Sequence, residues 1–345
     1  MSDNHPGHRQ QSDRGREHAH DHEHDGHEHT GGLRGWVTGL FHPHSHDAAD
    51  SALESSAQGI RAVKISLVAL AVTAALQMLV VAVSGSVALL ADTIHNFSDA
   101  LTALPLWIAF VVGRRAANRR YTYGYGRAED LAGLFIVAMI ALSAVVAGAQ
   151  AIRRLIDPVP IEHVGWVALA GLIGFLGNEL VAVYRIHVGR RIGSAALVAD
   201  GLHARTDGFT SLAVLAGAAG VAAGFPLADP IVGLLITVAI LAVLRGAVRD
   251  VYRRIMDAVD PELVDQAESA LLATPGVLEV RAIRMRWIGH RLHAEADLDI
   301  DGRISVTEAH RLAHAAEHRL THDIPRLRTA AIHAYPAHRH DVAVH

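Results

Sequence analysis

The chain of 345 residues contains no cysteine. This absence excludes disulfide bonds and thiolate metal ligands, and it weighs against a soft copper(I) site. A His-Glu-x-x-His motif is also absent, which argues against an intramembrane metalloenzyme. The N-terminus lacks the basic segment and apolar core of a signal peptide. We therefore expect the first apolar segment to act as its own insertion signal.

Apolar residues, by contrast, are abundant and concentrated in the middle of the chain. They make up 51% of the sequence, and the mean hydropathy is +0.24, although both ends of the chain are mostly polar. The net charge of -4 is unevenly distributed and says little about partners. We expect a lipid membrane to be a partner and no nucleic acid to be one.

Residues 1–58 form a polar segment with eleven histidines between His5 and His46. Such a composition cannot bury enough apolar surface to offset chain entropy. We expect a disordered, cytoplasmic N-terminal segment, whose histidines could capture metal ions loosely.

Six apolar spans follow, and each reaches the roughly 20 residues needed to cross a bilayer. They define a predicted six-helix transmembrane domain over residues 59–250, with spans at about 63–83, 86–112, 131–152, 164–186, 194–223 and 229–248. Asp229 and Pro230 predict the N-cap and first helical position of the sixth span. Arginines cluster between spans two and three, between spans four and five, and after span six, so the positive-inside rule places both termini in the cytoplasm.

Residues 251–337 have the pattern of a small soluble domain, followed by a tail at 338–345. Asp260-Pro261 predicts a helix start, and Val277–Trp287 with Arg291–Ile300 predicts a hairpin around Gly289. A capped helix from Ser305 and a strand over 330–335 complete an αββαβ order. This order indicates helices on one face of a sheet.

The second and fifth spans contain the same pattern, 108 residues apart. The second span contains Ala-Asp-Thr-Ile-His-Asn-Phe-Ser-Asp at 91–99, which includes His95 and Asp99. The fifth contains Ala-Asp-Gly-Leu-His-Ala-Arg-Thr-Asp at 199–207, which includes His203 and Asp207. On a helix, residues four apart share a face. Two such helices facing each other would offer two imidazoles and two carboxylates, a set that suits a tetrahedral divalent ion. A buried, hydrogen-bonded network that braces the two helices is the alternative.

Other polar residues within the spans have open interpretations. Asp92 and Asp200 precede each histidine by one turn and could stabilise helices or line an entry path rather than bind the ion. Glu179 in the fourth span is either functional or part of a structural ion pair with the Arg185 end of its helix. Gly171, Gly174 and Gly177 predict close helix packing.

Together these features resemble the cation diffusion facilitator family of divalent-metal transporters over about residues 62–336. The resemblance rests on the two repeated motifs, on Gly-Tyr-Gly-Arg-Ala-Glu at 124–129 and on Asp-Pro-Ile-Val-Gly at 229–233. It implies a homodimer that exchanges cytoplasmic metal ions for protons, with a ferredoxin-like cytoplasmic domain at the dimer interface.

The chain also departs from the family pattern. Tyr121 and Tyr125 occupy linker positions where many members have histidines, so an accessory site there is not expected. His310 and His333 fall where members with a cytoplasmic metal site have ligands, but the neighbouring acidic position is Tyr335. These two histidines are a candidate second site. The alternative for His310, with His314, His318 and His322, is a solvated helix face.

The sequence thus predicts an all-α six-helix transmembrane domain followed by a small α+β ferredoxin-like domain, in a multi-pass protein of the plasma membrane. The predicted function is Zn²⁺/H⁺ antiport, without enzymatic activity or a resident cofactor. Export of Co²⁺, Ni²⁺, Cd²⁺ or Fe²⁺ is one alternative, because such ligand sets do not decide selectivity alone. A membrane metal sensor that transports nothing is another, and manganese is the least favoured ion.

Overall fold

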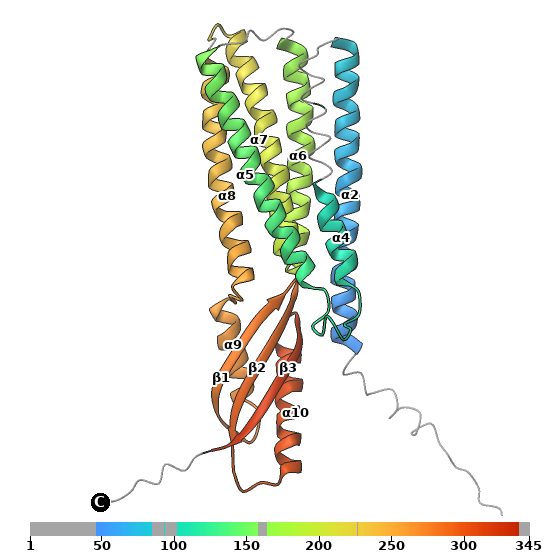
Figure 1. Cartoon of the computed structure of the whole chain (residues 1–345), viewed down its shortest axis with the longest axis vertical. Helices are drawn as coiled ribbons and strands as arrows, with labels where there is room; N and C mark the ends of the chain where they lie inside the picture. Colours follow the sequence, from blue (N-terminus) through green and yellow to red (C-terminus); the bar gives the residue numbers. More distant parts are fainter. Residues whose placement is uncertain (1–45, 85–92, 94–101, 158–163, 226, 338–345) are drawn as a thin grey trace, which may run out of the picture. The chain divides into compact units, whose positions relative to one another are not determined.

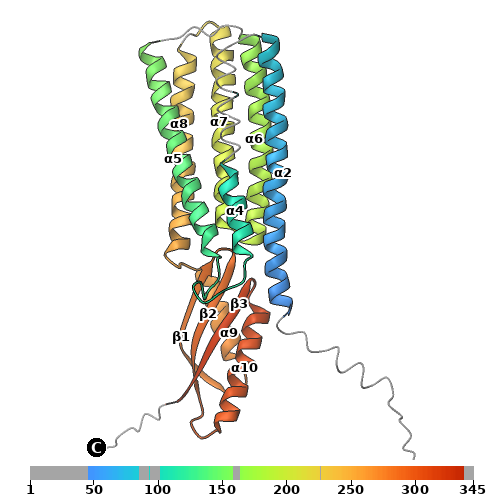
Figure 2. The same cartoon turned by 45° about the vertical axis from the view of Figure 1, so that its right-hand side comes forward.

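The structure is a computed structural model that describes residues 46–84, 93, 102–157, 164–225 and 227–337. The secondary structure that is described between residues 46 and 255 is entirely helical. The helices are α2 (His46–Ser84), α4 (Ala103–Gly113), α5 (Arg127–Ile156), α6 (Val164–Ile192), α7 (Ala195–Ala222) and α8 (Ala228–Ile255), which run side by side as a bundle (Figures 1 and 2).

Four of the described helices are long and apolar enough to cross a membrane. They are α5, α6, α8 and the part of α2 from Glu54. Their outer faces carry exposed apolar side chains such as Leu142, Leu180 and Leu235. Apolar surface of this extent is unfavourable in water and favourable in lipid, so the bundle is a membrane domain.

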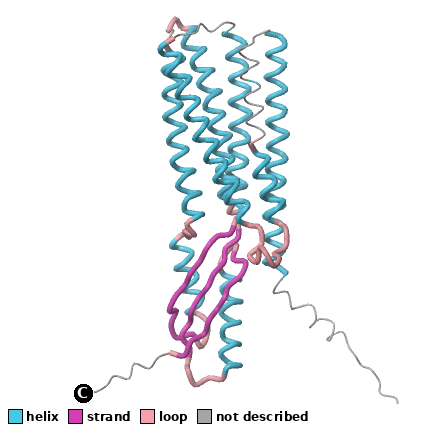
Figure 3. The backbone as a smooth tube through the Cα atoms, in the orientation of Figure 1, coloured by secondary structure: helices cyan, strands magenta, loops and turns pink. Residues whose placement is uncertain are grey.

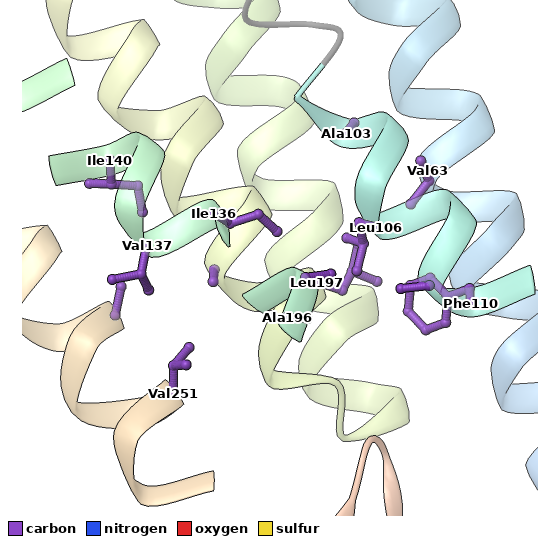
Figure 4. Packing of buried hydrophobic residues seen from close by; sticks show 14 of the residues in the cluster. Val63, Ala103, Leu106, Phe110, Ile136, Val137, Ile140, Ala196, Leu197 and Val251 are labelled. Carbon is purple, nitrogen blue, oxygen red and sulfur yellow. The ribbon is translucent and has the colours of Figure 1, made fainter. Parts of the chain in front are cut away.

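The bundle core contains a large cluster of buried apolar side chains, most of them from α2, α4, α5, α7 and α8. Figure 4 shows Leu106 and Phe110 of α4 close to Val63 of α2, with Leu197 of α7 and Ile136 of α5 beside them. These side chains are almost completely buried. The core therefore joins helices that are far apart in the sequence.

Helix α6 packs along α7, and α5 packs along α8. The link between α6 and α7 is very short: Gly193 has φ of +77°, a conformation that suits glycine. Ser194 then caps α7 by accepting a hydrogen bond from the Leu197 amide at 3.0 Å. Because the link is short, the antiparallel register of α6 and α7 is fixed.

The predicted glycine packing is confirmed. A Cβ atom at Gly171 would lie 3.0 Å from the Ser211 carbonyl oxygen of α7, and one at Gly177 would overlap Thr73 of α2. The helix α6 therefore approaches both neighbours closely. The predicted cap of the sixth span is wrong: α8 has Leu227 as its N-cap, and Asp229 lies in its first turn. Asp229 pairs instead with Arg154 of α5 at 2.8 Å.

The C-terminal part has the predicted αββαβ order. It consists of α9 (Pro261–Leu272), β1 (Val277–Ile288), β2 (Arg291–Ile300), α10 (Val306–Asp323) and β3 (Leu327–Pro336). In the sheet, shown in magenta in Figure 3, β1 pairs with β2 in antiparallel and β2 with β3 in parallel. Asp260 and Ser305 cap the two helices as predicted, accepting hydrogen bonds from the amides of Glu262 and Glu308.

Alternate residues of the strands face α9 and α10. Leu292, Leu298 and Ala316 belong to this second core, together with Leu271 and Leu320 of the helices. The opposite face of the sheet carries polar side chains. The fold class is therefore a helical transmembrane domain followed by a small α+β domain, as the sequence predicts.

Helix α2 begins at His46, before the boundary predicted at residue 58. The division of the chain at residues 58, 250 and 337 stays a prediction. Most of the polar N-terminal segment and the tail at 338–345 lie outside the described residues.

Candidate metal transport site

Helix α7 places the predicted ligands His203 and Asp207 together. They lie four residues apart on one face of the helix, and their Nδ1 and Oδ1 atoms are 3.8 Å apart. Their exposed fractions are 1% and 7%. An imidazole and a carboxylate buried side by side in an apolar bundle are costly without a task.

The other two predicted ligands, His95 and Asp99, lie outside the described residues. Of their motif the structure describes Thr93, which is helical and buried. Within the described ranges, no group of three or more His, Asp or Glu side chains has an arrangement that could hold a metal ion. The four-ligand set therefore stays a prediction, of which the structure describes the α7 half.

Asp200, one turn before His203, is completely buried and pairs with Arg185 of α6. Its Oδ2 lies 2.9 Å from Nη1 of Arg185, whose side chain is also almost inaccessible. Removing one partner of such a pair costs about 3–5 kcal/mol, because the other charge stays buried. Asp200 is thus bound by a neighbouring helix in this structure.

Glu179 forms a second pair between the same two helices. Its carboxylate accepts two hydrogen bonds from Arg205 of α7, at 2.6 and 3.2 Å. Both side chains are about 30% exposed. The structure thus has Glu179 in an ion pair, as one of the two interpretations of the sequence expected. Its partner is Arg205 of α7 and not Arg185 of its own helix. Arg185 belongs to the deeper pair with Asp200.

The Gly-Tyr-Gly-Arg-Ala-Glu motif lies where the helices meet the cytoplasmic domain. The carbonyl oxygen of Ile288, at the hairpin end, would be 3.0 Å from a Cβ atom at Gly126. Arg127 donates a hydrogen bond to Asp257 at 2.8 Å, and Glu129 lies 2.7 Å from the imidazole of His290. The motif therefore connects α5 with the segment that follows α8 and with the β1–β2 hairpin.

His310 and His333 lie apart within one chain. His310 is exposed on α10, which packs on one face of the sheet, and His333 is exposed on the other face. A recess around His333 is also lined by Ala282, Arg284, Glu295, Asp297 and Tyr335. The imidazoles of His310, His314, His318 and His322 all lie on the exposed side of α10, as the alternative of a solvated face predicts.

Sequence reasoning missed the two ion pairs between α6 and α7. The signal for them was present: an antiparallel helix pair joined at Gly193 brings together residues that lie at similar distances before and after the link. Arg185 and Asp200, and likewise Glu179 and Arg205, lie at such positions and have opposite charges.

An apolar helical bundle with a buried His-Asp pair, followed by an αββαβ domain, defines a multi-pass membrane protein with a small C-terminal domain. Comparison with known proteins agrees. Residues 63–256 match the model of the cation efflux transmembrane domain, and residues 259–337 match the model of the cation efflux protein cytoplasmic domain. The chain belongs to the cation efflux, or cation diffusion facilitator, family, and is a transporter rather than an enzyme.

Two related proteins and one solved structure show how similar the chain is to individual relatives. The chain is 68% identical over 314 residues to a probable cation efflux system protein of Mycobacterium tuberculosis, which covers 90% of this chain and 95% of that protein. It is 23% identical over 261 residues to the manganese efflux system protein MneS of Bacillus subtilis, covering 74% and 88%. A MamM C-terminal domain in a nickel form shares 22% identity, with a TM-score of 0.23, over 23% of this chain and all of that one.

Proposed function

We propose that the chain exports a divalent metal ion from the cytoplasm in exchange for protons, with Zn²⁺ as the first candidate. The observation that carries this proposal is the buried pair of His203 and Asp207 on one face of α7. The same pattern recurs in the sequence at His95 and Asp99. The four side chains would supply two nitrogen and two oxygen ligands, as zinc accepts.

Proton exchange follows from the chemistry of these ligands. An imidazole must be neutral and a carboxylate ionised before either can bind a metal ion. Binding of a cytoplasmic ion therefore releases protons, and protons arriving from the other side of the membrane compete with the ion. An inward proton gradient is then sufficient to drive export.

The choice of metal rests on the imidazoles. MneS is a manganese efflux protein by name, but manganese prefers oxygen ligands, and half of the proposed set is nitrogen. Cobalt, nickel, cadmium and ferrous iron fit the same ligands and are the alternatives.

We further propose a homodimer in the plasma membrane, with both termini in the cytoplasm. The family model that matches residues 259–337, the cation efflux protein cytoplasmic domain, carries the name ZT_dimer, which supports dimerisation. Because His310 and His333 lie on opposite sides of the sheet, an ion shared between them would need ligands from two subunits. The N-terminal histidines would serve as a loose cytoplasmic metal store.

Flux into proteoliposomes tests the proposal. Purified protein is reconstituted with a pH dye inside, and zinc, cobalt, nickel, cadmium and manganese are added separately. Zinc entry with opposite proton movement is the expected result. Tight zinc binding without flux of any metal would favour the sensor.

A further inference from the structure

The ion pair between Arg185 and Asp200 is the most deeply buried charge pair that the structure describes. The exposed fractions of the side chains are 3% and 0%. Its geometry is poor for a brace: one contact of 2.9 Å joins the two groups. Within the described part of the chain, Nε and Nη2 of Arg185 and Oδ1 of Asp200 have no hydrogen-bond partner, and Oδ2 of Asp200 has only the ion-pair contact with Nη1 of Arg185.

Bracing of α6 against α7 is already supplied elsewhere. Glu179 and Arg205 form a bidentate pair between the same helices. A Cβ atom at Gly201 would lie 2.9 Å from the backbone nitrogen of Ile186, which shows how closely the helices approach. The buried pair therefore calls for another explanation than helix packing.

The position of Asp200 on α7 supplies another explanation for the buried pair. Asp200 precedes His203 by three residues and Asp207 by seven, so the three side chains form one stripe along the helix. The stripe begins near the end of α7 that faces the cytoplasmic domain, where Arg326, just before β3, donates hydrogen bonds to the carbonyl oxygens of Arg190 and Arg191. An ion that enters from the cytoplasm reaches the level of Asp200 before that of His203.

We propose that Arg185 is a specificity-determining residue, which holds the Asp200 carboxylate in a neutral pair and so keeps it from binding the transported ion. The ion then has the imidazole of His203 and the carboxylate of Asp207 as its ligands from α7. A released Asp200 would add an oxygen donor and a negative charge, which favour manganese over zinc. This inference rests on the proposed function, since it takes His203 and Asp207 as ligands.

The test compares Mn²⁺ and Zn²⁺ binding to the purified full-length protein in detergent. Only the binding that Asp207→Asn removes is counted, because the N-terminal histidines also bind metal. Arg185→Gln should raise the ratio of Mn²⁺ to Zn²⁺ affinity by about 10- to 100-fold, the usual range for groups that act on a ligand. The double variant Arg185→Gln with Asp200→Asn should return the ratio to the wild-type value.

Two further variants serve if Arg185→Gln does not fold. Arg185→Lys retains the positive charge and should retain the wild-type ratio. Asp200→Asn leaves an uncompensated guanidinium and should weaken binding of both metals equally. The variants Glu179→Gln and Arg205→Gln are the matched controls, since they remove a pair between the same helices and should leave the ratio unchanged.

The outcomes are distinct. If Arg185→Gln, like the control variants, left the ratio of Mn²⁺ to Zn²⁺ affinity unchanged, the proposal would be overturned. The ion pair would then serve only to hold α6 against α7. Metal binding that is insensitive to Asp207→Asn would overturn the proposal as well, together with the ligand assignment. Binding with the expected ratio shift but no flux in proteoliposomes would support the inference while removing the proposed transport.

Discussion

Nδ1 of His290, at the turn of the β1–β2 hairpin, lies 2.7 Å from Oε2 of Glu129 at the start of α5, 161 residues away in the sequence. Both groups are buried, and Ser56 of α2 contacts the other imidazole nitrogen at 3.2 Å. The amide of Gly289 donates to Asp130 at 3.3 Å. The hairpin turn is thus fixed to two membrane helices by polar contacts, so the cytoplasmic domain and the bundle are mechanically connected.

The first prediction concerns this connection. His290→Ala leaves the buried Glu129 carboxylate without its partner, which costs about 1–3 kcal/mol. We expect a lower melting temperature in detergent and slower metal flux, with zinc binding to the transport site retained. Asp301→Asn is the control, because it removes an exposed pair with Arg303. A His290→Ala variant with wild-type flux and melting would show that the contact couples nothing.

The second prediction concerns the approach of α6 and α7. A Cβ atom at Gly201 would lie 2.7 Å from Cγ1 of Ile186 and 3.1 Å from the Ala182 carbonyl oxygen. Gly201→Ala must therefore separate the helices beside the predicted ligands, at a cost of about 1–3 kcal/mol. Melting temperature and flux should both fall. Gly246→Ala in α8, where nothing lies within 4 Å, should be neutral or slightly stabilising; equal effects at both glycines would contradict the packing argument.

The sequence predicted the elements well where local signals coincide with tertiary structure. Asp260 and Ser305 cap helices because short polar side chains can accept a hydrogen bond from the first turn. Asp229 satisfies the same rule, but an arginine on α5 competes for its carboxylate. A local pattern cannot reveal a partner that is brought near only by folding.

For the candidate site, too, the sequence predicted what depends on one helix and not what depends on two. The spacing of His203 and Asp207 places them on one face whatever surrounds the helix, and the structure has them there. The partner of Asp200 depends on the register between two helices. The predicted connection of Glu179 with Arg185 considered one helix alone, whereas the pairs form between helices because each charge in the bilayer needs a neighbour of opposite sign.

The third prediction concerns acid sensitivity. Burial on the sheet, with Arg286, Arg328, Arg291 and Arg127 nearby, lowers the pKa of His293 from 6.5 to about 4. The imidazole is then neutral in the folded domain, while the unfolded chain takes up a proton near pH 6.5. The contribution of the neutral His293 imidazole to the free energy of unfolding is complete above pH 6.5. It is lost as the pH falls from 6.5 toward 4.

His293→Gln should therefore weaken the loss of stability between pH 7 and pH 5. The stability at each pH is measured by hydrogen exchange of the β2 amides in the full-length protein, read by mass spectrometry. His322→Gln controls for the removal of a histidine from the same domain. A His293→Gln protein whose protection falls with acid as steeply as the wild type would contradict this origin.

The central claim is that His203 and Asp207 bind the transported ion. The most direct measurement is zinc flux into proteoliposomes with an internal pH dye, for the wild type and for Asp207→Asn. This variant is nearly isosteric and removes the ligand charge, so the bundle should fold normally. The account predicts zinc entry coupled to opposite proton movement in the wild type and loss of both signals in the variant. Wild-type flux from folded Asp207→Asn protein would contradict it.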